Sequence, residues 1–200
     1  MKRFTLFICF VFFSAYSYSQ EVLLDSAELS KARIFTSIKE AMKDPDKVYK
    51  LDLSKHKLDS FPVEITKFKN LQVLNLRKNK MVDIPKEIGD LTHLQWLDIS
   101  RSEVVNLDPA LGNLVHLKYL EMSRNDIETL PRTIGSLKEL EQLIMWDNNL
   151  HKMPDEIENL KNLKLLELQD IAMDAEMQEH IQSLLPNTKI RFSPACSCKF

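Results

Sequence analysis

Three pairs of residues with chemically useful side chains recur in this sequence at a separation of 23 residues. They are two histidines (His93 and His116), two aromatic residues (Trp96 and Tyr119) and two carboxylates (Asp98 and Glu121). Imidazoles bind metals, carboxylate pairs act as acids and bases, and exposed aromatic rings anchor partners. Which of these chemistries is available depends on how the fold places residues that are 23 positions apart in the sequence.

Neither the histidines nor the carboxylates predict an enzyme. The histidine positions correspond to Asn70, Glu139 and Asn162 in other copies, so they do not predict a metal site. The carboxylates are expected on an open sheet, where nothing encloses a substrate or raises a carboxyl pKa. The sequence has no His-Glu-x-x-His, nucleophile-elbow or Walker-type motif, and its 3 glycines leave little for a phosphate loop. We therefore expect neither enzymatic activity nor a cofactor.

The interval of 23 residues is an internal repeat that runs through most of the chain. One leucine position marks it, and further apolar residues follow each leucine at constant offsets; the marking residues are Leu71, Leu94, Leu117, Leu140 and Leu163, with Val48 one step earlier. One copy cannot bury its own leucines, so neighbouring copies must stack and share a core. The pattern resembles the leucine-rich repeat family, in the form L-x-x-L-x-L-x-x-N-x-L-x-x-L-P-x-x-I-G-x-L-x-x, over about residues 48–185.

That resemblance implies an α/β solenoid, with a curved parallel sheet on the concave face and short helices or turns on the convex face. Leu74 and Leu76 would point inward, and the residues that alternate with them outward. The same register turns two tryptophans and a tyrosine outward on neighbouring strands, where such rings typically anchor a partner. The partner-binding residues that we predict are Val73, Trp96, Asp98, Arg101, Tyr119, Glu121, Arg124 and Trp146.

A second outward column of the predicted sheet is charged. The eighth residues of the repeats are Lys55, Lys78, Arg101 and Arg124, followed by Asp147 and Asp170. We expect them to pair with neighbouring charges across about 5 Å, which contributes little stability per pair. The alternative is a polarised strip that docks a partner, in which case high salt would weaken binding.

Three other repeat positions are interpreted as structural. Asn79, Asn125 and Asn148 should bond the backbone of the turn that leaves each strand, with interruptions at His56, Ser102 and Ile171. The glycines share one position, where we expect a turn that needs a positive φ; they are Gly89, Gly112 and Gly135. Prolines share a bend on the convex side, and Pro109, shifted by one residue, predicts a different bend in the third unit.

The two ends of the solenoid need caps, because terminal repeats would otherwise expose their leucines. Residues 20–47 are interpreted as a linker and a capping helix over residues 37–42, and residues 48–185 as the repeat domain of about six units. A second helix is expected over residues 175–185, ended by Pro186. Residues 186–200 would form a C-terminal cap strand over residues 189–192 and a tail.

Residues 1–19 have the pattern of a signal peptide. Lys2 and Arg3 precede an apolar run over residues 4–13, and small residues at Ser17 and Ser19 predict cleavage after Ser19. The run is shorter than the roughly 20 residues of a membrane span, so we expect export to a periplasm or the cell exterior and no membrane span after cleavage. Cleavage would lower the 27 basic side chains to 25 against 29 acidic ones, which argues against a nucleic-acid partner.

The sequence therefore predicts a non-enzymatic module that binds a protein partner on the concave face of a solenoid. A polysaccharide is the alternative ligand, since aromatic rings also stack on sugars. A structural or adhesive role is a further alternative, in which Cys196 and Cys198 would cross-link chains in an oxidising compartment.

Overall fold

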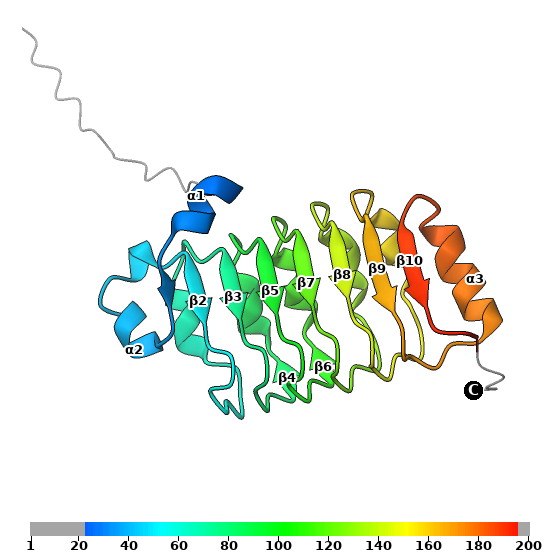
Figure 1. The fold of residues 1–200 in the computed structure, drawn as a ribbon, viewed down its shortest axis with the longest axis horizontal. Coiled ribbons are helices and arrows are strands. Elements are labelled where there is room, and N and C mark those ends of the chain that lie inside the picture. The colour runs from blue at the N-terminus through cyan, green and yellow to red at the C-terminus, as the bar shows by residue number, and fades with distance from the viewer. Residues whose placement is uncertain (1–22, 196–200) are drawn as a thin grey trace, which may run out of the picture.

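The computed structural model describes residues 23–195. Its main element is a sheet of eight parallel strands in the order β1-β2-β3-β5-β7-β8-β9-β10. The strands are β1 (Ile34–Phe35), β2 (Lys50–Asp52), β3 (Val73–Asn75), β5 (Trp96–Asp98), β7 (Tyr119–Glu121), β8 (Gln142–Ile144), β9 (Leu165–Leu168) and β10 (Lys189–Phe192). Figure 1 shows them side by side along the length of the molecule. The predicted parallel sheet is thus confirmed.

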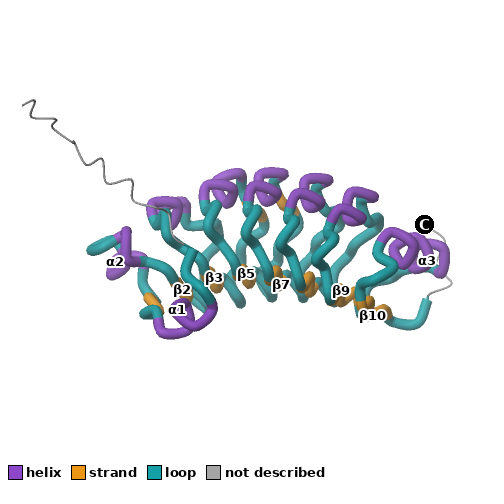
Figure 2. Tube along the Cα trace, turned by 90° about the horizontal axis from the view of Figure 1, so that it is seen from above, coloured by secondary structure: helices purple, strands orange, loops and turns teal. Residues whose placement is uncertain are grey.

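Short 3-10 helices return the chain from one strand to the next on the opposite side of the molecule. They are η1 (Pro45–Lys47), η2 (Val63–Lys67), η3 (Lys86–Asp90), η4 (Pro109–Asn113), η5 (Arg132–Ser136) and η6 (Asp155–Asn159). Seen from above, the strands line the inner side of an arc and the helical turns its outer side (Figure 2). A second small sheet pairs β4 (Asp83–Ile84) with β6 (Asn106–Leu107) between the two sides.

The core is a continuous column of leucines and other apolar residues between strands and turns. Strand pairing sets equivalent residues of successive repeats side by side, so that Leu74 faces Leu97 and Leu97 faces Leu120. Leu74 and Leu76 are fully buried, whereas Val73 and Asn75 are half-buried on the other face. The alternation predicted for the strands is confirmed.

Helices lie at both ends of the sheet. The expected helix near the N-terminus is α2 (Ile38–Ala41), and the expected C-terminal helix is α3 (Ala175–Leu184), whose first turn is capped by Asp174. Two elements were not expected: α1 (Ser26–Lys31), which carries an Asp25–Glu28 capping box, and β1, which adds a strand before the first predicted one. The parallel sheet therefore begins at residue 34.

The three glycines share one repeat position, as predicted, but a positive φ is not the reason. None of the described glycines has a positive φ; all three lie inside 3-10 helices. A Cβ atom on Gly89 would lie 2.8 Å from the Ala110 carbonyl oxygen, and one on Gly135 would lie 2.3 Å from that of Glu156. Glycine is needed because each turn packs directly against the backbone of the next. Most left-handed residues of the described chain are instead at the eighth repeat position, from Lys55 (φ 59°) to Asp170 (φ 55°).

The asparagine ladder is present at the predicted positions. The Asn125 amide donates to the carbonyls of Ile99 and Met122 at 3.1 and 2.9 Å and accepts from the amides of Ser102 and Val104. At Ser102 the ladder is weakened but not broken, because the hydroxyl lies 3.2 Å from the Leu76 carbonyl. Two ladder positions without asparagine, His56 and Ser102, have a further strain.

That strain is visible in the backbone one residue later. Lys57 and Glu103 follow His56 and Ser102, and both have a positive φ that their counterparts after asparagine lack. The third unit otherwise follows its neighbours: Pro109 is the first residue of η4, which begins at the same repeat position as η3 and η5. The different bend predicted there is absent, and the change is confined to the cap, where Asp108 accepts from the Ala110 amide at 2.8 Å.

Candidate partner-binding surface

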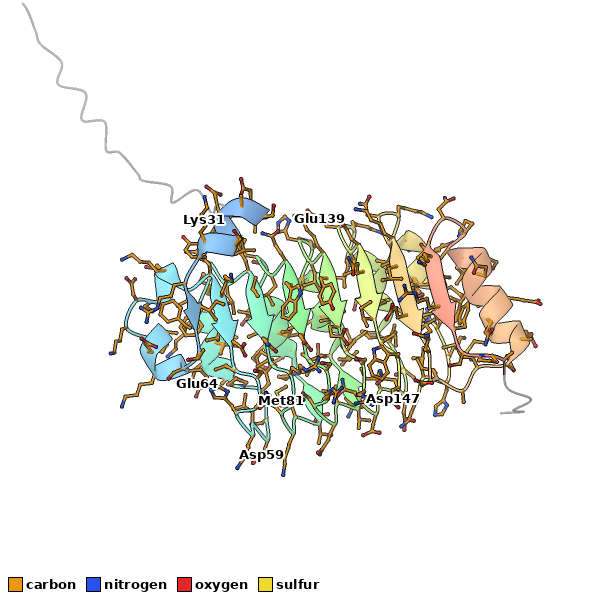
Figure 3. The ribbon with its side chains drawn as sticks, viewed as in Figure 1. Lys31, Asp59, Glu64, Met81, Glu139 and Asp147 are labelled. Carbon is orange, nitrogen blue, oxygen red and sulfur yellow. The ribbon has the colours of Figure 1, made fainter. Side chains whose placement is uncertain are left out.

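The concave face presents three rows of side chains, one behind another along the strands. The first row contains Val73 on β3, Trp96 on β5 and Tyr119 on β7; the second contains Asp98 and Glu121. The third follows the strands at the eighth repeat position. Glu139, which precedes β8, and Asp147, which follows it, lie at opposite ends of the strands in Figure 3.

Trp96 and Tyr119 form what we call the aromatic stack. Their ring centroids are 5.4 Å apart and the rings are nearly parallel, with an interplanar angle of 3°. The pairing of β5 with β7 places the two residues directly opposite each other. Both side chains are half-buried, so each ring uses one face on its neighbour and still reaches solvent. The centroid distance lies within the range of about 4.5–7 Å that is typical of interacting aromatic pairs.

Trp146 stands apart from the aromatic stack. It lies four residues beyond Gln142, the residue that pairs with Tyr119, which is roughly 13 Å along an extended chain. Its ring is contacted by the Arg124 guanidinium, whose carbon lies 4.9 Å from the ring centroid. The concave face therefore holds two separate aromatic groups rather than one cluster of three rings.

Asp98 and Glu121, the carboxylate pair, lie next to the aromatic stack and are more deeply buried than an open sheet predicts. They are only 5% and 8% exposed. Asp98 accepts from the Ser100 amide at 2.8 Å, and Glu121 accepts from the amide and hydroxyl of Ser123. The Tyr119 hydroxyl donates to the second Glu121 oxygen at 3.2 Å.

Burial changes the acidity of these groups. Desolvation raises the pKa of Asp98 and of Glu121 above their ordinary values, and each rise is enlarged by a neighbouring negative charge. The same two causes raise the pKa of the Tyr119 hydroxyl to about 12. The expectation that nothing would raise these carboxyl pKa values was wrong, because neighbouring side chains cover the sheet at its second row.

The third row, which we call the basic row, consists of Lys55, Lys78, Arg101 and Arg124. Among the described residues, only its last member has an acidic partner: Arg124 lies 3.4 Å from Asp147. Lys78 instead has a lowered pKa, caused first by Lys55 and then by Arg101. The expected pairing along this column is therefore confirmed only between Arg124 and Asp147, where the side chains at this repeat position change from basic to acidic.

The N-terminal segment adds contacts that the repeat pattern does not indicate. Lys50, the first-row residue of β2, donates to the Leu29 carbonyl at the end of α1 at 3.1 Å. The Leu24 amide donates to Gln72, and Gln95 donates back to the Leu24 carbonyl at 3.1 Å. This segment thus occupies the edge of the sheet beside the first repeats. No periodic signal marks these contacts, since residues 23–35 precede the repeats.

A hollow of about 820 Å³ lies beneath this segment, between α1, α2 and η1. Its walls include Phe35 and Tyr49, and the Arg33 guanidinium covers the Phe35 ring at 4.6 Å from the centroid. Arg33 also pairs with Glu40 at 2.5 Å. The aromatic stack lies on other strands, so this hollow is separate from the rows described above.

The histidines do not form a site together. His93 contacts the Lys69 carbonyl at 2.6 Å, whereas His116 contacts Glu139 at 2.9 Å. Within residues 23–195, no group of three or more histidine, cysteine, aspartate or glutamate residues is arranged to hold a metal ion. Over the same residues, no helix has the length and apolar character needed to cross a bilayer.

Family comparisons agree with this geometry. Residues 46–104 match the model described as "leucine rich repeat", and residues 105–186 match the "leucine-rich repeat region" model. The chain belongs to the leucine-rich repeat family. The two matches together span the strands from β2 to β9 and the turns between them, so all three rows described above are made of these repeats. A comparison with functionally curated proteins gave no significant match.

Solved leucine-rich repeat structures share this fold. A leucine-rich repeat protein of Leptospira interrogans is 29% identical with a TM-score of 0.66, over 82% of this chain and 49% of that protein. Internalin C2 of Listeria monocytogenes is 22% identical with a TM-score of 0.65, over 82% of this chain and 69% of that protein. This chain thus spans about half the length of the Leptospira protein.

A plant receptor shares the fold over a shorter part of its length. The leucine-rich repeat ectodomain of an Arabidopsis thaliana membrane receptor kinase, in complex with Casparian strip integrity factor 2, is 28% identical with a TM-score of 0.58. The match covers 72% of this chain and 18% of that one. The fold is therefore shared with bacterial proteins and with a receptor ectodomain solved with a bound factor. The predicted signal peptide, Cys196 and Cys198 lie outside the described residues.

Proposed function

We propose that this leucine-rich repeat protein is an exported, non-enzymatic module that holds a protein partner against its concave face. The observation that carries the proposal is the aromatic stack of Trp96 and Tyr119, half-buried on the concave side and 5.4 Å between centroids. A rigid pair of large rings offers contact area with little loss of side-chain freedom, which is the property of residues that dominate protein interfaces.

The surroundings of the stack favour a protein over a sugar. Stacking on a sugar ring uses a free aromatic face, and in the aromatic stack each ring has at most one face left. The Trp146 ring is likewise in contact with Arg124. A protein surface can instead use the ring edges together with the polar atoms beside them, including Glu121 and Tyr119. The Arabidopsis receptor ectodomain, solved in complex with Casparian strip integrity factor 2, is a precedent for a bound factor on this fold.

The proposed site consists of the predicted residues, now divided into groups. Val73, Trp96 and Tyr119 would form the apolar contact, Asp98 and Glu121 the polar floor beside it, and Arg101, Arg124 and Trp146 a second contact at the far edge. We propose no catalytic role for Asp98 and Glu121, since both carboxylates are already held by hydrogen bonds from neighbouring residues. The family's repeats serve as binding scaffolds.

Affinity capture tests the proposal. The chain from residue 20 onward would be used to capture partners from the medium and envelope of the source cells, followed by mass spectrometry. A variant with Trp96, Tyr119 and Trp146 changed to Ser should lose the captured protein. The matched control changes Val63 and Val115 to Ser, which are exposed apolar residues outside the sheet (49% and 44% exposed). Equal capture by the serine variant and the control would refute the proposed use of the concave face.

The proposed export has its own test. The full-length chain would be expressed in the source cells, and the protein recovered outside the cytoplasm would be sequenced from its N-terminus. Cleavage after Ser19 gives a mature chain that begins at Gln20. Recovery of the uncut chain from the cytoplasm alone would contradict export.

A further inference from the structure

We propose that the basic row docks a short, acidic, extended segment of the protein partner. This inference rests on the proposed function and adds the chemistry of the partner. The row contains Lys55, Lys78, Arg101 and Arg124, which follow β2, β3, β5 and β7 at one repeat position.

The backbone holds the row at a constant spacing. The Lys55 amide donates to the Arg77 carbonyl at 2.9 Å, and the Lys78 amide to the Ser100 carbonyl at 2.9 Å. The amides of Arg101 and Arg124 continue the same ladder. Parallel strands lie about 4.8 Å apart, so the four cations extend over roughly 14 Å across the strands.

The charges in the row are not neutralised by the protein itself. No carboxylate of the described residues lies within ion-pair distance of Lys55, Lys78 or Arg101; the pair between Arg124 and Asp147 ends the row. Lysines and arginines this close repel one another, and the lowered pKa of Lys78 has that cause. An anion that binds between the cations offsets this repulsion.

The backbone gives no reason for basic residues at this position. All four row residues have a left-handed conformation, with φ between 57° and 59°. The next two repeats adopt the same conformation with Asp147 and Asp170, and aspartate tolerates it better than lysine or arginine does. Four cations here therefore cost stability in two ways, which is the pattern expected of a binding surface.

The neighbouring acidic residues define what kind of anion fits. Asp98 and Glu121 lie three residues before Arg101 and Arg124, and Asp147 and Asp170 continue the row beyond its end. A uniformly charged polymer such as an acidic polysaccharide would meet these carboxylates. A peptide crossing the strands covers roughly 14 Å with about five residues, so it can confine its acidic side chains to the row. The charges around the basic row therefore favour an acidic peptide segment over an acidic polysaccharide as its ligand.

The probe is a fluorescein-labelled nonapeptide with glutamates at alternating central positions, followed by fluorescence anisotropy at low ionic strength. The test variant carries Lys78→Asn and Arg101→Asn, because asparagine is neutral and accepts a positive φ. The control variant carries Lys67→Asn and Lys86→Asn, two exposed lysines of η2 and η3 that remove the same charge. Equal thermal midpoints of both variants would establish that they are folded.

The row variant should bind the peptide at least about tenfold more weakly, while the control stays within about twofold, and added salt should weaken binding to the wild type. Equal affinities of the two variants, or equal binding of a peptide with glutamines in place of glutamates, would overturn the proposal. Tighter, row-dependent binding of polygalacturonate would overturn the choice of a peptide.

The same variants separate this inference from the proposed function. If a captured partner is lost on the serine variant of the aromatic residues but kept by the row variant, the concave-face function stands and the acidic-segment inference fails. If the row variant loses the peptide while the serine variant still captures the partner, the affinity of the row for acidic peptides stands. The proposed use of the aromatic residues then fails.

Discussion

The convex turns and the concave strands of this solenoid obey different constraints. On the convex side, each 3-10 helix packs so closely on the next that Gly135 has no room for a Cβ atom against Glu156. On the concave side, the residues facing out of the sheet change from Val73 to Trp96 to Tyr119 without any change of register. The convex side sets the shape of the molecule, and the concave side is free to vary within that shape.

The concave face also contains features that do not favour stability. Asp98 and Glu121 are buried without a cation at ion-pair distance among the described residues, and Lys78 stands between two like charges. Polar and charged groups that lower the stability of the fold are typical of surfaces to which a partner binds. Substitutions on the convex side, or in the asparagine ladder between the two faces, should therefore destabilise the fold. Substitutions on the concave face should mostly affect binding.

The largest loss is expected at the ladder between the two faces. Asn125→Ala removes hydrogen bonds to two carbonyls and from two amides of buried residues, and of these groups the Met122 carbonyl keeps a second donor in Asn148. Leaving buried groups unpaired costs about 1–3 kcal/mol each, so the free energy of unfolding should fall by at least about 3 kcal/mol. Chemical denaturation measures it. Asn149→Ala, at the exposed neighbour of Asn148, is the control and should cost much less.

The second largest loss is expected on the convex side. In Gly135→Ala the new methyl group meets a backbone carbonyl at 2.3 Å, which only a shift of the adjacent turn can relieve. Overpacking of this kind costs about 1–3 kcal/mol of unfolding free energy, whereas Ser136→Ala at the next, exposed position should cost little. Binding of the captured partner should be unchanged in both variants. A loss of binding in Gly135→Ala alone, with the fold intact, would contradict the division between the two faces.

A smaller effect is expected within the aromatic stack. Trp96→Leu and Tyr119→Leu would each remove one ring, and the double variant would complete a thermodynamic cycle. Stacked rings are coupled by about 0.5–1.5 kcal/mol beyond the area that they bury, so the double variant should lose less stability than the sum of the single losses. The corresponding cycle between Trp96 and Trp146 is the control, and it should show no coupling because these rings stand in separate rows.

The same division explains which features were predictable from the sequence. The recurrence of Leu71, Leu94 and Leu117 determines the stacking of the repeats, so the register that turns Trp96 and Tyr119 outward followed directly. Glycine serves both close packing and positive φ, and its position alone does not distinguish them, so Gly89 was assigned the wrong reason. The depth at which Asp98 lies depends on the side chains of three neighbouring strands. The elements α1 and β1 lie before the repeats and have no periodic signal.

The smallest effect is expected at the carboxylate pair. Substitutions there should raise the stability of the fold, whereas the substitutions described above should lower it. A carboxyl group whose pKa is raised in the folded state binds its proton more tightly there than in the unfolded chain, so it stabilises the fold as the pH falls through the raised pKa toward the ordinary value. For Asp98 and Glu121 the raised pKa arises first from burial. At a pH above the raised pKa both groups are ionised, and there their buried charges oppose folding.

The combined variant Asp98→Asn and Glu121→Gln should therefore unfold at a higher temperature than the wild type at pH 7. The gain should stay below about 1 kcal/mol, because the hydrogen bonds from Ser100 and Ser123 offset part of the cost of burying the two charges. The difference should shrink as the pH falls toward the ordinary carboxyl range, where the wild-type groups take up protons. Asp90→Asn, an exposed change on η3, provides the control for loss of negative charge alone. A variant less stable than the wild type at pH 7 would show that the ionised pair supports the fold, and the contrast between the two faces would then fail at its second row.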